Sequence, residues 1–222
     1  MLEVSYLPAF DQRSSAEALS GPLNTLSRQL LRHTPWKEFP EKPAVSFAMA
    51  HGDGAIYLKY FVEEETLRST YLNPNDPVYK DSCVEFFISF EGDEHYYNFE
   101  WNCGGTCLAG FGKGKERALL PAADILKIKH HSQIRTSSAV LNAGIAGTKH
   151  PVHWELTLII PAEVFIHHHF STFSNIKARG NFFKCGDELP QPHYLAWNNI
   201  LSAAPEFHLQ EFFAEIYFSH VG

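Results

Sequence analysis

The chain has 222 residues, of which 45% are hydrophobic and 19% are charged, so it has the composition of a globular protein that can bury a sizeable core. Its formal net charge of −7 provides no basic surface for nucleic acid and argues against binding to anionic membranes. The N-terminal region has neither the apolar segment of a signal peptide nor a membrane span. We therefore expect a cytoplasmic protein, or an exported one if a leader precedes this sequence.

The first third of the chain predicts mostly strands. A strand is expected over Glu3–Leu7, a short helix over Pro22–Arg32, and a hairpin from Val45–Ala50 and Ala55–Val62 around a His-Gly-Asp-Gly turn. Residues 1–40 are expected to form an N-terminal extension that packs on the domain.

Strands also dominate the remainder. They are expected over Cys83–Phe90, Tyr96–Trp101, Lys127–Thr136, Ala139–Leu141, Val152–Ile160, Lys177–Lys184 and Phe212–Phe218, with single helical turns at Pro121–Leu126 and Pro161–Phe165. Long amphipathic helices are missing. This pattern predicts an all-β protein, an antiparallel, jelly-roll-like β-sandwich with one or two short helices, formed as one domain by residues 1–222.

The strands Cys83–Phe90 and Tyr96–Trp101 carry the most informative pattern. Side chains alternate between the two faces of a strand, so Asn98 and Glu100 share one face and the aromatic residues between them share the other. Glu85 interrupts an otherwise apolar strand, and a carboxylate there is either solvated or buried with a partner. Two aromatic strands with polar groups on one face are suited to binding a small polar ligand.

The four cysteines are Cys83, Cys103, Cys107 and Cys185. Cys103 and Cys107 have no matching second pair at metal-ligand spacing, so free, buried thiols are the preferred interpretation. Cys83 in particular is expected to be buried on its strand. The run His167–His169 is expected to be a solvated loop, since adjacent residues on a strand point to opposite faces.

Three sequence blocks resemble a known family. They are the segment DSCVEFFI with the tyrosine two residues before it, the segment Asn181–Ile200, and the segment Pro205–Phe218. Together they resemble the family 9 carbohydrate-binding modules, and more closely the stand-alone family 9-like proteins of bacteria. The resemblance implies a β-sandwich that binds a mono- or oligosaccharide and has no catalytic activity of its own, with carbohydrate-active enzymes as candidate partners.

The resemblance also implies the site residues. An aromatic ring six residues before the glutamate of the first block contacts sugar in the family, as does that glutamate, and these positions are Tyr79 and Glu85 here. The family usually has Trp at the first position and a basic residue where this chain has Asn98. A second aromatic residue closes the slot over the sugar, and Trp197 is our choice for it. Sugar recognition requires such stacking rings together with polar groups that donate and accept hydrogen bonds.

Further residues are weaker candidates. Glu100, Lys184, Asp187 and His193 lie in the matching blocks, and we expect Lys184 and Asp187 to pair with each other rather than to line the slot. Two other functions stay open: a glycoside hydrolase that uses Glu85 and Glu100 as its carboxylate pair, and a sandwich that binds a protein partner.

No catalytic metal or cofactor is expected. A structural calcium ion is an alternative, with the loop oxygens of Asn73, Asn75 and Asp76 as the nearest candidate ligands, although the spacing of an EF-hand is absent.

Overall fold

The computed structural model describes residues 1–135 and 146–220. Its strands are β1 (Leu2–Asp11), β2 (Gln29–Leu30), β3 (Ala44–Asp53), β4 (Ala55–Leu67), β5 (Cys83–Phe90), β6 (Tyr96–Asn102), β7 (Cys107–Lys113), β8 (Glu116–Leu119), β9 (Lys129–Arg135), β10 (Ala146–Pro161), β11 (Lys177–Cys185), β12 (Tyr194–Ala196) and β13 (Ala214–Phe218). The helices are α1 (Ala16–Leu23) and α2 (Ala122–Ile125), and single 3₁₀ turns lie at Val78–Lys80, Ala162–Val164 and Gln210–Phe212. The strand expected at Ala139–Leu141 lies outside the described residues.

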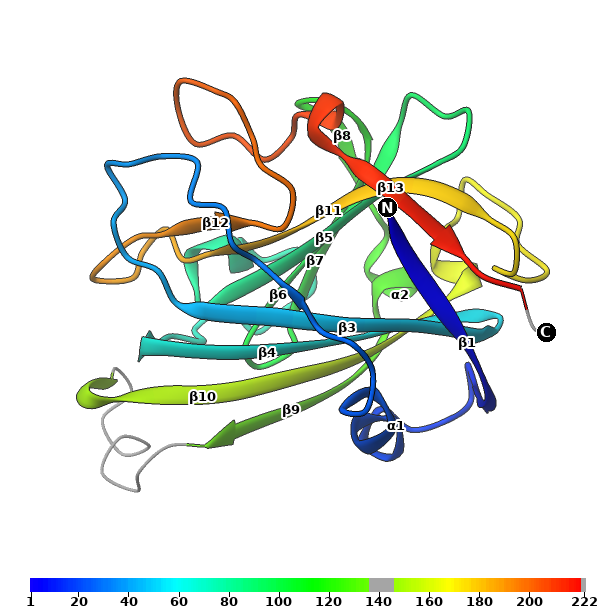
Figure 1. Ribbon diagram of the computed structural model, residues 1–222, viewed down its shortest axis with the longest axis horizontal. Coiled ribbons are helices and arrows are strands. Elements are labelled where there is room, and N and C mark those ends of the chain that lie inside the picture. Colours follow the sequence, from blue (N-terminus) through cyan, green and yellow to red (C-terminus); the bar gives the residue numbers. More distant parts are fainter. Residues whose placement is uncertain (136–145, 221–222) are drawn as a thin grey trace.

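The strands form two layers that pack face to face (Figure 1). One layer has the order β8-β7-β6-β5-β11-β13, and the other has the order β3-β4-β10-β9. Strand β1 joins them, because its first residues pair with β13 and its later residues pair with β3. The predicted β-sandwich is confirmed. Its strand pairs are antiparallel except for the two that β1 makes, which are parallel.

The N-terminal segment is part of the sheets. The strand expected at Glu3–Leu7 is present within β1, and β2 adds to the edge of β3. Residues 1–40 therefore do not simply pack on a finished domain as an extension. Because β1 connects the two layers, its loss would separate the edges that it holds together.

The predicted helix over Pro22–Arg32 is wrong, since the helix lies earlier. The side chain of Ser15 accepts a hydrogen bond from the backbone N–H of Ala18 and so caps the start of α1. The helix then buries Ala16, Leu19 and Leu23, which also have helical spacing. Pro22 lies in the last turn rather than the first, and the residues beyond the helix extend to pair with β3.

The main core lies between the two layers. Strands β5 and β6 each send alternate side chains into it, as the sequence pattern predicts: Tyr97, Phe99 and Trp101 are completely buried there. From the facing layer, Trp154, Leu156 and Leu158 of β10 are buried in the same core, which confirms their predicted direction. The other side chains of β5 and β6 consequently point to the outer face of their layer.

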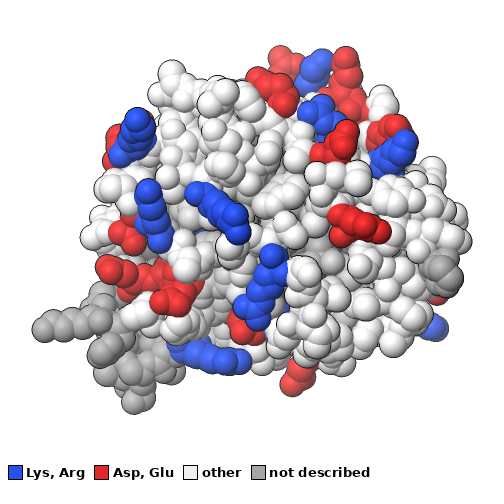
Figure 2. Space-filling model, in the orientation of Figure 1, with Lys and Arg blue, Asp and Glu red and all other residues white. Residues whose placement is uncertain are grey.

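The surface has no continuous patch of one charge on the face shown in Figure 2, where Lys and Arg side chains lie among Asp and Glu side chains. Among the described residues, no helix has both the length and the apolar character needed to span a membrane.

Candidate functional site

A cavity of about 450 Å³ opens on the outer face of the layer formed by β5, β6, β7 and β11. Its floor is made by the side chains that β5 and β6 direct away from the core. Its polar lining includes Glu85, Asn98, Glu100, Arg117 and Asp187, and its aromatic lining includes Tyr79, Tyr194 and Phe207. The volume lies in the usual range for a small-molecule site. The structure thus brings together five of the eight candidate residues from the sequence: Tyr79, Glu85, Asn98, Glu100 and Asp187.

Two carboxyl groups form the floor of the cavity. Glu85 on β5 is the register partner of Glu100 on β6, and their residues are 3% and 5% exposed. Among the described residues, four carboxylates are buried, and the other two, Glu64 and Asp81, each have a Lys or Arg nitrogen within 4.0 Å. Glu85 and Glu100 have none. A buried charge without a counter-charge is costly, so this pair is not explained by the stability of the fold.

Burial sets the protonation of this pair. Loss of solvent raises the pKa of Glu85 well above its ordinary value, and the neighbouring Glu100 carboxyl adds to the rise. Burial likewise raises the pKa of Glu100, against a lowering effect of the hydrogen bond from Asn98. Glu85 thus favours its neutral form, and Glu100, whose pKa is raised to about 7, has both forms populated near neutral pH; a neutral carboxyl group can donate one hydrogen bond and accept others.

Asn98 lies beside this pair and has an unused acceptor. Its Nδ2 donates to Glu100 Oε1 at 3.0 Å, whereas its buried Oδ1 has no hydrogen-bond partner among the described residues. The register partner of Asn98 on β7 is Gly110, and a Cβ atom there would lie 2.8 Å from Asn98 Oδ1. Glycine at position 110 therefore leaves room for the amide.

The aromatic lining comes from segments outside the central strands β5, β6 and β7. Tyr79 lies in the 3₁₀ turn before β5, and Tyr194 is the first residue of β12. Phe207 lies in the loop between β12 and the 3₁₀ turn at Gln210–Phe212. Phe207 stacks on the ring of Phe183 with centroids 4.2 Å apart, which fixes its plane. These rings are partly exposed, so they are free to contact a ligand.

The aspartate of the first sequence block holds the Tyr79 turn in place. Asp81 is completely buried and accepts hydrogen bonds from the backbone N–H groups of Thr70 and Tyr71 and from Asn102 Nδ2. It is also 3.3 Å from Arg68 Nε. These contacts tie the preceding loop to β6, and so they fix where the Tyr79 ring meets the cavity.

Sequence reasoning missed Tyr194, Phe207 and Arg117. Tyr194 and Phe207 lie within the two C-terminal blocks, so their position in those blocks was the available signal. Arg117 lies on the short edge strand β8, and no motif pointed to it.

Trp197 does not line the cavity. Its ring packs edge-on against two core rings, Phe47 at 6.0 Å and Phe182 at 5.6 Å between centroids. Both belong to the main core between the layers, which lies on the opposite face of β11 from the cavity. The expectation that Trp197 closes the slot with Tyr79 is therefore wrong for this structure, whose cavity is lined by Tyr79, Tyr194 and Phe207.

Replacing Trp197 with alanine should mainly reduce stability. The ring is partly rather than fully buried, so we expect a loss of about 2–3 kcal/mol, below the ~3–5 kcal/mol typical of a core Trp. Urea unfolding measures this loss, and the affinity for any cavity ligand should change less than twofold in the folded variant. A variant of unchanged stability that no longer binds ligand would restore Trp197 as a binding platform.

Lys184 and His193 lie elsewhere. Lys184 is completely buried on the core face of β11, where its Nζ is 2.9 Å from Glu64 Oε2 and 2.8 Å from His193 Nε2. The expected pairing of Lys184 with Asp187 is therefore wrong. Lys184 and Cys185 are neighbours on one strand and point to opposite faces, so the partner of Lys184 comes from β4 in the other layer.

The loop proposed for calcium uses side chains in hydrogen bonds to the protein backbone. Asp76 Oδ2 accepts hydrogen bonds from the backbone N–H groups of Leu72 and Asn73, and Asn75 Nδ2 donates to the carbonyl of Leu120. A calcium ion at this loop stays a prediction. His167 and His169 are exposed in a loop, as expected, whereas His168 is partly buried beside Tyr97, whose hydroxyl lies 3.0 Å from His168 Nδ1.

Comparison with known families agrees with this architecture. The family model described as carbohydrate-binding family 9 matches residues 18–218. The chain belongs to carbohydrate-binding family 9. This family 9 chain also resembles a solved structure from Bacteroides uniformis whose suggested role is carbohydrate binding, with 33% identity, 98% of both chains covered and a TM-score of 0.87.

Two more distant structures share the fold. A carbohydrate-binding module family 9 from Caldicellulosiruptor kristjanssonii has been solved with glucose and with cellotriose. The two structures are 13% identical to this family 9 chain, with TM-scores of 0.62 and 0.61, covering all of this chain and 96% and 94% of theirs. A comparison with curated proteins found no match.

Proposed function

We propose that the cavity over β5, β6, β7 and β11 binds a mono- or oligosaccharide without transforming it. The observation that carries this proposal is the buried pair Glu85 and Glu100, which has no Lys or Arg nitrogen within 4.0 Å among the described residues and lines a cavity with three aromatic rings. Family membership supports the same function, and the solved family 9 module with glucose and cellotriose makes glucose-based sugars the first ligands to test.

The chemistry of the lining matches that of a sugar. Vicinal hydroxyl groups both donate and accept hydrogen bonds, and neutral carboxyl groups with an amide offer the same mixture. Asn98 Oδ1 is an acceptor that no described residue satisfies. The apolar C–H face of a pyranose packs on flat rings, and Tyr79, Tyr194 and Phe207 supply them.

Hydrolysis fits the site less well than binding. A retaining or inverting glycosidase needs one carboxyl group protonated and the other ionised, so their surroundings must push the two pKa values apart. Here burial raises the pKa of both Glu85 and Glu100. Among the described residues, no Lys or Arg nitrogen lies within 4.0 Å of either group to hold it ionised as a nucleophile or base, and on this ground we propose that the protein is not an enzyme.

Calorimetric titration with glucose, cellotriose and a panel of other sugars tests this proposal. Replacing Glu100 with glutamine should weaken the binding of the best sugar by about 0.5–3 kcal/mol, the range from a hydrogen bond to a neutral group up to one to a charged group, which is roughly 2- to 150-fold in Kd. The exposed Glu163, remote in sequence on the turn after β10, provides a control, and Glu163→Gln should bind as the wild type does.

Three outcomes would contradict the proposal. Equal sugar affinity of Glu100→Gln and wild type would show that the sugar binds outside this cavity. Failure to bind any sugar would favour a protein-binding sandwich. Turnover of aryl glycosides that is lost in Glu100→Gln would favour the hydrolase.

A further inference from the structure

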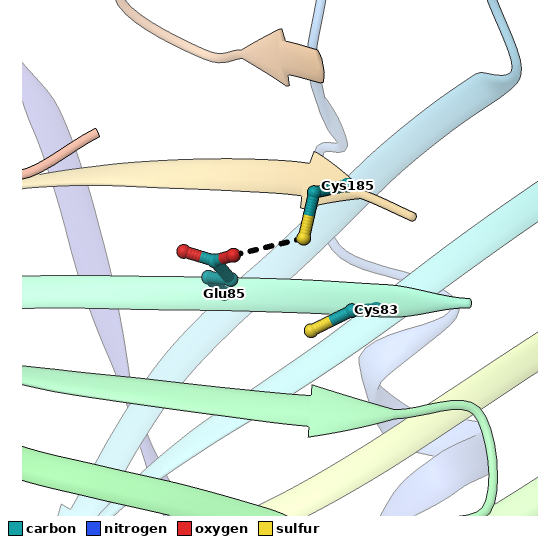
Figure 3. Close-up of side chains that lie close together, drawn as sticks. All are labelled: Cys83, Glu85 and Cys185. Carbon is teal, nitrogen blue, oxygen red and sulfur yellow. Dashed lines mark hydrogen bonds between the residues drawn. The ribbon is translucent and has the colours of Figure 1, made fainter. Parts of the chain in front are cut away.

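Three side chains with metal-binding atoms meet at one end of the cavity floor. The Sγ atoms of Cys83 and Cys185 and a carboxylate oxygen of Glu85 all lie within 4.8 Å of one another. Figure 3 shows that Cys83 and Glu85 come from one strand and Cys185 from its neighbour. The cysteines are far apart in the sequence, so no spacing motif reveals the cluster.

The sheet register explains why these groups converge. Cys83 on β5 is the direct partner of Cys185 on β11, and Glu85 follows Cys83 by two residues on the same face. Cys185 Sγ lies 3.0 Å from Glu85 Oε1, which it contacts as a hydrogen-bond donor. Because the three groups stand on two paired strands rather than on a loop, their positions are fixed by the backbone.

The buried Glu85 carboxyl group in this cluster lacks a Lys or Arg partner in the described part of the chain. Glu85 is 3% exposed, and among the described residues no Lys or Arg nitrogen lies within 4.0 Å of it, in contrast to the buried Glu64 with Lys184 and Asp81 with Arg68. Buried carboxylates are ordinarily paired with a cation or coordinate a metal. The thiol of Cys185 is at present the only hydrogen-bonding neighbour of the Glu85 carboxyl group in the described structure.

An ion has access to the cluster from the cavity. Glu85 and Cys185 both line the cavity wall, and the completely buried Cys83 is the register partner of Cys185. All four cysteines of the chain are free thiols. Two sulfur ligands disfavour calcium and magnesium, which bind oxygen, and favour a soft or borderline divalent cation such as zinc.

We propose that Cys83, Cys185 and Glu85 form a binding site for a zinc-like divalent cation, with a fourth coordination position open to the cavity. Three protein ligands and one open position are the arrangement found in exchangeable zinc sites, where a water molecule completes the tetrahedron. Binding releases the two thiol protons and the carboxyl proton of Glu85 to solvent, so that two thiolates and one carboxylate surround the cation. The site goes beyond sugar binding and shares Glu85 with the proposed sugar site, but metal binding can be tested without any sugar present.

Cobalt is the most informative probe, because thiolate ligands give Co²⁺ an intense near-ultraviolet charge-transfer band that imidazole ligands do not. The reduced, chelator-treated full chain is titrated with Co²⁺ and then with Zn²⁺, in the absence of sugar. We expect one equivalent of Co²⁺ to produce the thiolate band and Zn²⁺ to displace it. A wild-type chain without this band would overturn the proposal directly, and binding through exposed histidines alone would count as the same result.

Variants identify the ligands. Cys83→Ser and Cys185→Ser should each remove the thiolate band or weaken metal affinity at least tenfold, and Glu85→Gln should weaken it by a similar factor. Cys107 is also buried and free but lies on β7 in the main core, so Cys107→Ser should bind metal as the wild type does. Thermal unfolding of each variant shows that it is folded. Loss of the band in Cys107→Ser, or its retention in both other serine variants, would contradict this assignment.

Discussion

Replacing Lys184 with methionine should lower the free energy of unfolding by about 3–5 kcal/mol, the usual effect of removing one partner from a buried ion pair. The side chains of Lys184 and Glu64 are 0% and 2% exposed, and Nζ lies 2.9 Å from Oε2. Glu64 Oε1 also accepts a hydrogen bond from Trp154 Nε1 at 2.6 Å, which holds the buried carboxylate in place. The variant therefore leaves a buried carboxylate without its cation.

A surface ion pair of similar length serves as the control. Lys113 Nζ lies 2.7 Å from Glu94 Oε2, but the two side chains are 60% and 77% exposed. Lys113→Met should change stability by less than about 1 kcal/mol. In the double variant Glu64→Gln with Lys184→Met, part of the lost stability should return, because the unpaired charge is gone. Urea unfolding that shows equal, small losses for both lysines would refute the assignment of a buried pair.

Acid should destabilise the protein through His193. Lys184 Nζ donates to His193 Nε2 at 2.8 Å, so the ring is neutral with its proton on Nδ1, which lies 3.2 Å from the carbonyl of Gln191. Burial and the Lys184 charge lower the pKa of His193 from 6.5 to about 2. In the unfolded chain the ring has its ordinary pKa of 6.5. Below pH 6.5 the unfolded state therefore binds a proton at His193, whereas the folded state does not.

The size and sign of this effect follow from proton linkage. Stability contributed by the lowered His193 pKa is complete above pH 6.5 and falls by about 1.4 kcal/mol per pH unit below it, which is about 3 kcal/mol at pH 4.5. Glutamine can accept from Lys184 without taking up a proton. Between pH 7 and 4.5, the free energy of unfolding of His193→Gln should therefore fall by about 3 kcal/mol less than that of the wild type, as measured by urea unfolding. Equal losses in the two chains would show that His193 titrates normally in the fold.

The sequence was sufficient to predict the elements that its alternation controls. Strand β5 has the predicted bounds, and the division of β6 into Asn98 and Glu100 on one face and three rings on the other is confirmed, because period-2 alternation fixes side-chain direction without knowledge of partners. Cys83 is buried and free, as expected. The cavity floor was therefore predictable from one hairpin.

What depends on distant partners was not predictable. Lys184 pairs with Glu64 across the two layers, and neither sequence spacing nor periodicity links β11 to β4. The family resemblance implies a second aromatic residue over the sugar and does not say which ring supplies it. The packing of Phe47 and Phe182 directs the Trp197 ring to the core, and the smaller Tyr194 and Phe207 line the cavity instead. The helix was misplaced for a local reason, since the Ser15 cap outweighed the apolar spacing that follows Pro22.

The most direct test of the central claim is a crystal structure of the chain with the tightest-binding sugar of the calorimetric panel, starting with glucose. We predict a sugar in the cavity, with hydroxyl groups within hydrogen-bond distance of Glu85, Glu100 or Asn98 and one face against Tyr79, Tyr194 or Phe207. A sugar bound at full occupancy elsewhere, with this cavity filled only by water, would contradict the account.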